Sequence, residues 1–214
     1  MLGVNLGHLG FLVEIHPDEL PEALDRLEAE QFTVEPHSAL LVGIGDDESV
    51  GFNDVAIVRV PGNGAVQAVL SVGGQPMGRY RRDGLVVSTA IGSTAYADAA
   101  GGPVVSPKLD ALIVAPLAPM AGISRPMVVS ADEPIRLELL PESGAAAVEV
   151  DGLVVGEASA GGALDVRLSP GAGQVVRLDS DRYQRRNQVK LSLPDLPFLP
   201  EELRELSPRP ALGS

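Results

Sequence analysis

The residues best suited to chemistry form a block of small and hydroxyl-bearing side chains near the middle of the chain. Asp83-Gly-Leu-Val-Val-Ser-Thr-Ala-Ile-Gly-Ser-Thr-Ala-Tyr96 reads as an apolar strand, then a glycine-containing turn, then the start of a helix. Backbone N–H groups and hydroxyls at such a turn suit ribose hydroxyls or phosphate oxygens, and Tyr96 could stack on a base or sugar. The alternative is a Ser/Thr helix cap after a strand, with Tyr96 packed in the core.

The first elements of the chain belong to an incomplete layer. Residues 1–31 read as a glycine-interrupted strand, a loop and a helix, because Leu20, Leu24 and Leu27 recur at helical spacing and acids occupy the first turn. One strand and one helix make a piece of an α/β layer and not a domain. A second helix is expected after Gly92, over residues 93–100.

From about residue 34 the pattern becomes one of short strands. Ile135-Arg-Leu-Glu-Leu and Leu164-Asp-Val-Arg-Leu alternate between apolar and polar residues, which indicates strands with one solvent-facing side. The expected strands cover residues 54–60, 66–72, 85–89, 111–115, 135–140, 147–151, 164–168 and 174–178. Glycine and proline turn signals separate them, including Ser169-Pro-Gly171. This series predicts a β-sandwich or a related all-β architecture.

Composition excludes several classes of function. The formal net charge is −13, with 16 Lys and Arg against 29 Asp and Glu, which argues against nucleic acid and against an anionic membrane surface as partners. No cysteine is present, so disulfides, zinc–thiolate sites, iron–sulfur clusters and cysteine nucleophiles are excluded, and the histidines show no metal-ligand spacing. We find no apolar run of membrane-spanning length and no signal-peptide pattern, and we expect a cytoplasmic protein.

The central block also has a family resemblance. It is similar to the block that defines the NAD kinases, in which a strand leads into Gly-Ser-Thr-Ala-Tyr and then into Gly-Gly-Pro, here Gly101-Gly-Pro103. Other blocks agree in order and spacing: Gly3–Leu12, Phe52-Asn-Asp-Val-Ala-Ile57, Leu109–Pro116, Arg125–Val129 and Val150-Asp-Gly152. The chain resembles the family from residue 1 to about 183. The implied fold is mainly β, the β-sandwich-type C-terminal domain of NAD kinases, with a short α/β remnant at the N-terminus.

The resemblance implies a reaction and its substrates. The family transfers the γ-phosphoryl group of ATP, or of polyphosphate in some members, to the 2′-hydroxyl of the adenosine ribose of NAD. Such a transfer needs positioning and neutralisation of phosphate charge by Mg²⁺. The implied partners are therefore NAD, NADP and ATP with Mg²⁺. Family members are usually homo-oligomers, so a homo-oligomer is expected.

The resemblance also implies roles for particular residues. Asn53 and Asp54 would hydrogen-bond the nicotinamide-side ribose of NAD, because an amide beside a carboxylate offers donors and acceptors to a vicinal diol. Thr94, Ala95 and Tyr96 would line the adenosine half, and Asp83 would face the nucleotide in a pocket completed by a neighbouring subunit. The alternatives are an Asx turn at Asn53-Asp54 and a simple turn at Asp83. Asp151-Gly152 reads first as a turn and is left out of the site.

The chain departs from the family pattern in several places. Thr89-Ala90-Ile91 replaces Thr-Pro-Thr, which removes a hydroxyl close to the nucleotide; Met120 stands where His is common, and Arg82 stands where glycine is frequent. The largest departure is that no Gly-Gly-Asp-Gly turn occurs, although in the family this turn binds phosphate and carries the aspartate proposed as base. We therefore assign no catalytic residue within this chain.

These observations give three segments and leave alternatives open. Residues 1–33 are expected to be the remnant of an α/β domain, residues 34–183 an all-β NAD-binding domain, and residues 184–214 a proline-rich tail with a short helix near residues 200–206. The chain is either part of a longer NAD kinase or a non-catalytic NAD(P)-binding module or assembly partner derived from one. A lipid or sphingoid-base kinase is a third possibility, against which Gly-Ser-Thr-Ala-Tyr argues.

Overall fold

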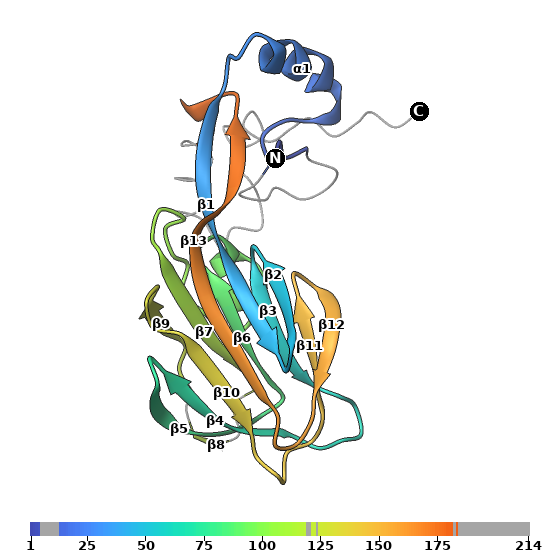
Figure 1. Ribbon diagram of the computed structural model, residues 1–214, viewed down its shortest axis with the longest axis vertical. Helices are drawn as coiled ribbons and strands as arrows, with labels where there is room; N and C mark the ends of the chain where they lie inside the picture. Colours follow the sequence, from blue (N-terminus) through green and yellow to red (C-terminus); the bar gives the residue numbers. More distant parts are fainter. Residues whose placement is uncertain (5–12, 119–120, 123, 182, 184–214) are drawn as a thin grey trace. The chain divides into compact units, whose positions relative to one another are not determined.

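The computed structural model describes residues 1–4, 13–118, 121–122, 124–181 and 183, and it divides into two compact units (Figure 1). Unit 1 combines residues 1–37 with 173–214, and unit 2 comprises residues 38–172. Strands β1 (Thr33–Ile44) and β13 (Ala163–Arg177) each contribute residues to both units. Most of the glycine-punctuated segment, Met120 and the tail with its expected helix lie outside the described residues.

Unit 1 contains the expected helix. A 3₁₀ turn, η1 (Pro17–Glu19), leads into α1 (Leu20–Glu28). His16 begins the turn with a capping box, in which its backbone N–H donates to Glu19 Oε2 at 2.7 Å. The expected first strand is represented in the described residues by a single parallel bridge between Val4 and Ile15.

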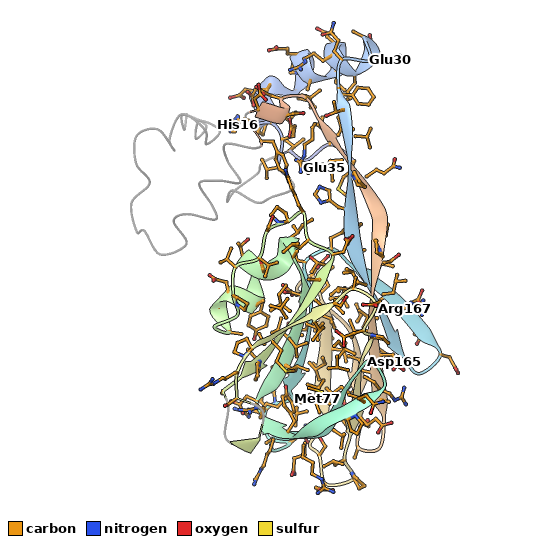
Figure 2. All side chains as sticks on the ribbon, turned by 90° about the vertical axis from the view of Figure 1, so that its left-hand side faces the viewer. His16, Glu30, Glu35, Met77, Asp165 and Arg167 are labelled. Atoms are coloured by element: carbon orange, nitrogen blue, oxygen red, sulfur yellow. The ribbon has the colours of Figure 1, made fainter. Side chains whose placement is uncertain are left out.

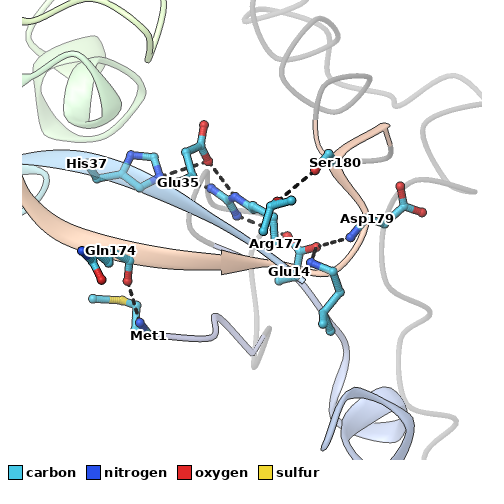
Figure 3. A network of polar contacts seen from close by, with 10 residues as sticks. Met1, Glu14, Glu35, His37, Gln174, Arg177, Asp179 and Ser180 are labelled. Carbon is cyan, nitrogen blue, oxygen red and sulfur yellow. Dashed lines mark hydrogen bonds and ion pairs between the residues drawn. The ribbon is translucent and has the colours of Figure 1, made fainter. Parts of the chain in front are cut away.

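Unit 1 also buries a group of charged side chains (Figure 3). Arg177 is 2 % exposed and lies 3.3 Å from Glu14, which is equally buried, and 2.7 Å from Glu35. His37 lies 3.2 Å from Glu35, and the Arg177 guanidinium stacks 3.5 Å from the centre of the Tyr183 ring. The contacts of Arg177 with Glu14 and Glu35 join segments that lie more than a hundred positions apart in the sequence, and removing one partner would leave a buried charge unpaired.

Unit 2 holds the greater part of two antiparallel sheets. The first runs in the order β2-β1-β13-β10-β4-β5-β8, and the second in the order β12-β11-β3-β6-β7-β9. Besides β1 and β13, the strands are β2 (Asp47–Gly51), β3 (Asp54–Arg59), β4 (Val66–Val72), β5 (Gln75–Arg82), β6 (Gly84–Thr89), β7 (Ala111–Leu117), β8 (Ala121–Gly122), β9 (Met127–Ser130), β10 (Ile135–Leu139), β11 (Ala146–Val150) and β12 (Leu153–Ala158). Among the residues that the structure describes, no helix is both long and apolar enough to cross a lipid bilayer.

The main core lies between the two sheets. Leu70 and Leu137 from the first sheet and Ile57 and Leu85 from the second belong to one buried cluster, as expected when apolar faces of two sheets pack together. Along β10 and the first part of β13, buried and exposed residues alternate, which confirms the predicted solvent-facing sides. Asp165 and Arg167 extend from the exposed side of β13 (Figure 2).

The second sheet is covered on its other face as well. All six residues of β6 are buried, because a smaller apolar cluster lies on the face away from the main core. This cluster joins Ala56 and Val86 to Ala90 and Ala97, which belong to the segment after β6. That segment forms a 3₁₀ turn, η2 (Ile91–Thr94), and one helical turn, α2 (Tyr96–Ala99). The helix expected over residues 93–100 is thus present in shorter form, interrupted by Ala95.

Two expectations for the strands were wrong or incomplete. Ser169-Pro-Gly171 is not a turn but lies within β13, a continuous strand of 15 residues. The pairing of β10 with β13 ends at Val166, so the missing N–H of Pro170 removes no bond to that neighbour. Strands β1, β2, β5, β8, β9 and β12 were not predicted. In β12 the reason is that Leu153, Val154 and Val155 are exposed, so apolar residues there do not mark a buried face.

Candidate functional site

The candidate site forms where β3 begins and β6 ends. The two strands are antiparallel, and Asp54 lies opposite Ser88. The start of one strand therefore meets the end of its neighbour, so that Asn53 and Asp54 lie beside the Thr89–Tyr96 segment. These two stretches are distant in sequence, and the sheet register brings them together.

Thr89 and Gly92 lock the two stretches to each other. Thr89 donates its backbone N–H to the Asn53 carbonyl at 2.9 Å and its hydroxyl to the Phe52 carbonyl at 2.7 Å. The same hydroxyl accepts the Gly92 N–H at 3.1 Å. A Cβ atom on Gly92 would lie only 1.9 Å from the Asn53 carbonyl oxygen, so only glycine allows this approach.

Asp54 is the buried carboxylate of the site. It is 6 % exposed, and its Oδ2 accepts the backbone N–H of Tyr96 at 3.4 Å. Burial raises the pKa of Asp54 above its usual range; the Tyr96 N–H opposes this, and the carboxylates of Asp151 and Glu149 raise the pKa further. A hydrogen-bond donor from a ligand would stabilise the ionised form.

The side chains around Asp54 leave part of the site open to a ligand. Tyr96 is 37 % exposed, so the alternative in which it packs in the core is wrong. Ala95 is also exposed, and Asn53 and Thr94 are half-buried. An amide, a carboxylate, a hydroxyl and an aromatic ring thus occur on neighbouring segments, a set that suits hydroxyl groups and a flat ring.

The expected cradle of backbone N–H groups is not formed in the turn. The N–H groups of Gly92 and Tyr96 are bonded to Thr89 and Asp54. Those of Ser93 and Ala95 donate to the carbonyls of Ala90 and Gly92 at 3.3 and 2.9 Å. The turn therefore fits ribose hydroxyls better than phosphate oxygens. Among the described residues no group of three or more His, Asp or Glu is arranged to hold a metal ion.

Asp151 was missed by sequence reasoning. It lies at the turn between β11 and β12, and its carboxylate accepts the N–H groups of Phe52, Asn53 and Asp54 at 2.7, 2.8 and 3.0 Å. The Asp-Gly pair signalled the turn correctly, but nothing in the local sequence indicates a partner almost a hundred positions away.

Asp83 is not brought to this cluster within one chain. It precedes β6, whose first residue, Gly84, lies opposite Val58 near the far end of β3. There Asp83 pairs with Arg59, with Nε and Oδ1 2.7 Å apart. The other predicted site residues, Asn53, Asp54, Thr94, Ala95 and Tyr96, fall on the stretches that the start of β3 and the end of β6 bring together.

The two-sheet architecture defines the class of protein. The fold matches the crystal structure of yeast NADH kinase complexed with NADH, with a TM-score of 0.78 and 22 % identity, over 92 % of this chain and 60 % of that one. It also matches an NAD kinase from Archaeoglobus fulgidus in complex with ATP, with a TM-score of 0.73 and 27 % identity, over 89 % of this chain and 73 % of that one. This is the fold of the β domain of NAD(H) kinases.

Sequence comparisons identify the family. Residues 52–178 match the ATP-NAD kinase C-terminal domain. The chain is 36 % identical to the NAD kinase of Corynebacterium glutamicum and 38 % identical to that of Leifsonia xyli, in each case over 200 residues and 91 % of this chain. It spans 69 % and 66 % of those two proteins. The chain belongs to the NAD kinase family, as its motifs predicted.

Proposed function

We propose that this chain binds NAD at the candidate site formed by Asn53, Asp54 and the Thr94–Tyr96 segment. It would do so as part of an enzyme that phosphorylates the 2′-hydroxyl of the adenosine ribose to give NADP. The observation that carries the proposal is the meeting of the Asp54 carboxylate with the Tyr96 segment at 3.4 Å in a member of this family. Asp54 would accept hydrogen bonds from the nicotinamide-side ribose, with the Asn53 amide as donor and acceptor beside it. Thr94, Ala95 and Tyr96 would contact the adenosine half.

The phosphoryl donor is proposed to be ATP with Mg²⁺, or polyphosphate. Mg²⁺ keeps several waters and binds chiefly to substrate phosphates, so it would arrive with ATP as part of the substrate. The family's Gly-Gly-Asp-Gly turn does not occur in these 214 residues, so we assign the donor phosphates and the catalytic base to no residue of this sequence.

A second copy of the chain would explain how Asp83 could contact a bound nucleotide. Its distance along β3 and β6 from Asp54 rules out a shared contact with one ribose in a single chain. We therefore propose a homo-oligomer in which Asp83 faces the nucleotide of a neighbouring subunit. Sedimentation analysis with and without NAD tests this, and a chain that stays monomeric at every concentration would remove Asp83 from the site. A cytoplasmic location is proposed separately, from the sequence alone.

The binding proposal is tested by calorimetry with NAD. Replacing Asn53 and Asp54 together with Ala should weaken binding by about 2–5 kcal/mol, because each lost buried or charged hydrogen-bond partner costs about 1–3 kcal/mol. Asp132→Asn, an exposed carboxylate on the turn between β9 and β10, is the matched control and should leave the affinity unchanged. Unchanged affinity in the double variant would remove both residues from the site.

The catalytic proposal is tested separately by measuring NADP formation from NAD and ATP–Mg²⁺. The 214-residue chain should bind NAD without making NADP. The same chain extended at its N-terminus by a family segment that carries Gly-Gly-Asp-Gly should be active. Turnover by the 214-residue chain would show that it contains its own catalytic group. Binding without turnover in the extended protein would favour the alternative function, a non-catalytic NAD(P)-binding module.

A further inference from the structure

The turn between β11 and β12 is built against the candidate site. One carboxylate, that of Asp151, accepts three successive backbone N–H groups: Oδ2 takes that of Phe52, and Oδ1 takes those of Asn53 and Asp54. The Asp151 N–H donates in return to the Asp54 carbonyl at 2.9 Å. Four hydrogen bonds thus hold the backbone of residues 52–54 to one residue, at the point where β3 begins.

The backbone around this turn is shaped for the contact. Asp151 adopts φ +48°, which is uncommon for a residue with a side chain, and Gly152 follows with φ +79°. A Cβ atom on Gly51 would lie 2.7 Å from Val150 Cγ1, so the hairpin tip packs directly against the start of the 52–54 segment. Glycine or Asn would meet the φ requirement of position 151 as well as Asp, so the turn alone does not call for a carboxylate.

The chemistry of the contact does call for a carboxylate. An ionised carboxylate has two oxygens that only accept, and both are used here. An Asn amide would offer one oxygen, and its NH₂ group would face a backbone N–H. The acceptor pair is therefore specific to Asp at this position.

We propose that Asp151 is a positioning residue of the nucleotide site, which orients Asn53 and Asp54 for the ribose diol. This inference rests on the proposed function. Asp151 has a second effect, because its charge and that of Glu149 raise the pKa of Asp54, whose burial is the main cause of the shift and is opposed by the Tyr96 N–H. The orienting effect does not depend on the protonation state of Asp54, whereas the charge effect acts only where Asp54 titrates.

Two variants separate these effects. Asp151→Asn removes both the charge and one acceptor, whereas Glu149→Gln removes only a charge. NAD affinity is measured by calorimetry from pH 8 down to pH 5. At pH 8, Asp151→Asn should weaken binding about 10- to 100-fold, as expected for a lost charge-assisted hydrogen bond, and Glu149→Gln should stay within about twofold of the wild type.

The acid side of the profile gives the second readout. A removed negative charge lowers the pKa of Asp54, so both variants should retain their own affinity to lower pH than the wild type does. An Asp151→Asn protein that binds NAD as tightly as the wild type at pH 8 would overturn the proposal. So would a loss of equal size in Glu149→Gln, because charge alone would then account for it.

Amide hydrogen exchange distinguishes positioning from folding. In Asp151→Asn the N–H groups of residues 52–54 should exchange faster, while those of the core strand β4 keep their protection. General loss of protection would assign Asp151 to folding and overturn the proposal. If the wild-type chain fails to bind NAD, the proposed function fails, and exchange at residues 52–54 still reports whether Asp151 holds this segment.

Discussion

Gly92→Ala tests the close approach on which the candidate site depends. The added Cβ would lie 1.9 Å from the Asn53 carbonyl oxygen and 2.5 Å from its carbon, whereas ordinary contacts lie at 3.4–4 Å. Relief therefore needs a shift of about 1.5 Å in backbone on one side or the other. The Asn53 carbonyl cannot move away without stretching the 2.9 Å hydrogen bond that it accepts from the Thr89 N–H. Overpacking costs about 1–3 kcal/mol and the strained bond about 1 kcal/mol, so we expect a loss of about 2–4 kcal/mol in the free energy of unfolding.

The same shift should reach the ligand. Asp54 follows Asn53 directly, so its carboxylate moves with the displaced backbone, and NAD affinity should fall together with stability. Chemical denaturation gives the free energy of unfolding, and calorimetry on the folded variant gives the affinity. Gly43→Ala is the matched control. The nearest atoms to an added Cβ at this position lie at 3.9 Å, and Gly43 lies on strand β1 in the same unit. If Gly92→Ala matched Gly43→Ala in both measurements, the packing of the turn against Asn53 would be refuted.

Two further substitutions concern buried charges. Arg82 is fully buried, and its three side-chain nitrogens have no hydrogen-bond partner among the residues that the structure describes, with only the Tyr80 ring 5.5 Å from the guanidinium. Arg82→Met should therefore raise the free energy of unfolding by about 1–3 kcal/mol. The control is Arg79→Met, at an exposed position on the same strand, which should change the free energy of unfolding by less than about 0.5 kcal/mol. A destabilised Arg82→Met protein would mean that the guanidinium is paired. Because the folded pKa of Asp54 is raised, its ionisation opposes folding as pH rises through and above its unfolded pKa, so Asp54→Asn should be more stable than the wild type at pH 7, with an advantage that fades below about pH 4. Denaturation at several pH values checks this, and an advantage that grows on acidification would contradict the sign of the shift.

Local patterns predicted much of the fold. Alternation of apolar and polar residues predicted β10 and the first part of β13 as strands with one solvent-facing side, and the helix near Leu20 followed from leucine spacing and the acids in its first turn. The strands that were missed have their reasons in the structure. In β5 only Tyr80 and Arg82 are buried, and a buried arginine gives no hydrophobic signal.

The candidate site was predicted in part from the order of sequence motifs, and not from the alternation that predicted the strands. Motif order predicted Asn53, Asp54 and Tyr96 as members of one site, and the family assignment from the same motifs is confirmed. The motifs could not show that the turn uses its own N–H groups internally. They also set Asp151 aside, because a hydrogen bond across almost a hundred positions leaves no trace in a local pattern.

The sequence by itself determined the β architecture, the family and the short list of residues that could bind a nucleotide, because strand alternation, turn chemistry and motif spacing are all local properties of the chain. Only the tertiary structure decided which of those residues meet. The antiparallel register of β3 and β6 brings Asp54 to Tyr96 and sends Asp83 to Arg59 at the far end. The tertiary structure also brings the Asp151 carboxylate to the backbone of residues 52–54 and buries Arg82. Such long-range pairings depend on how whole sheets pack, and no short stretch of sequence specifies that.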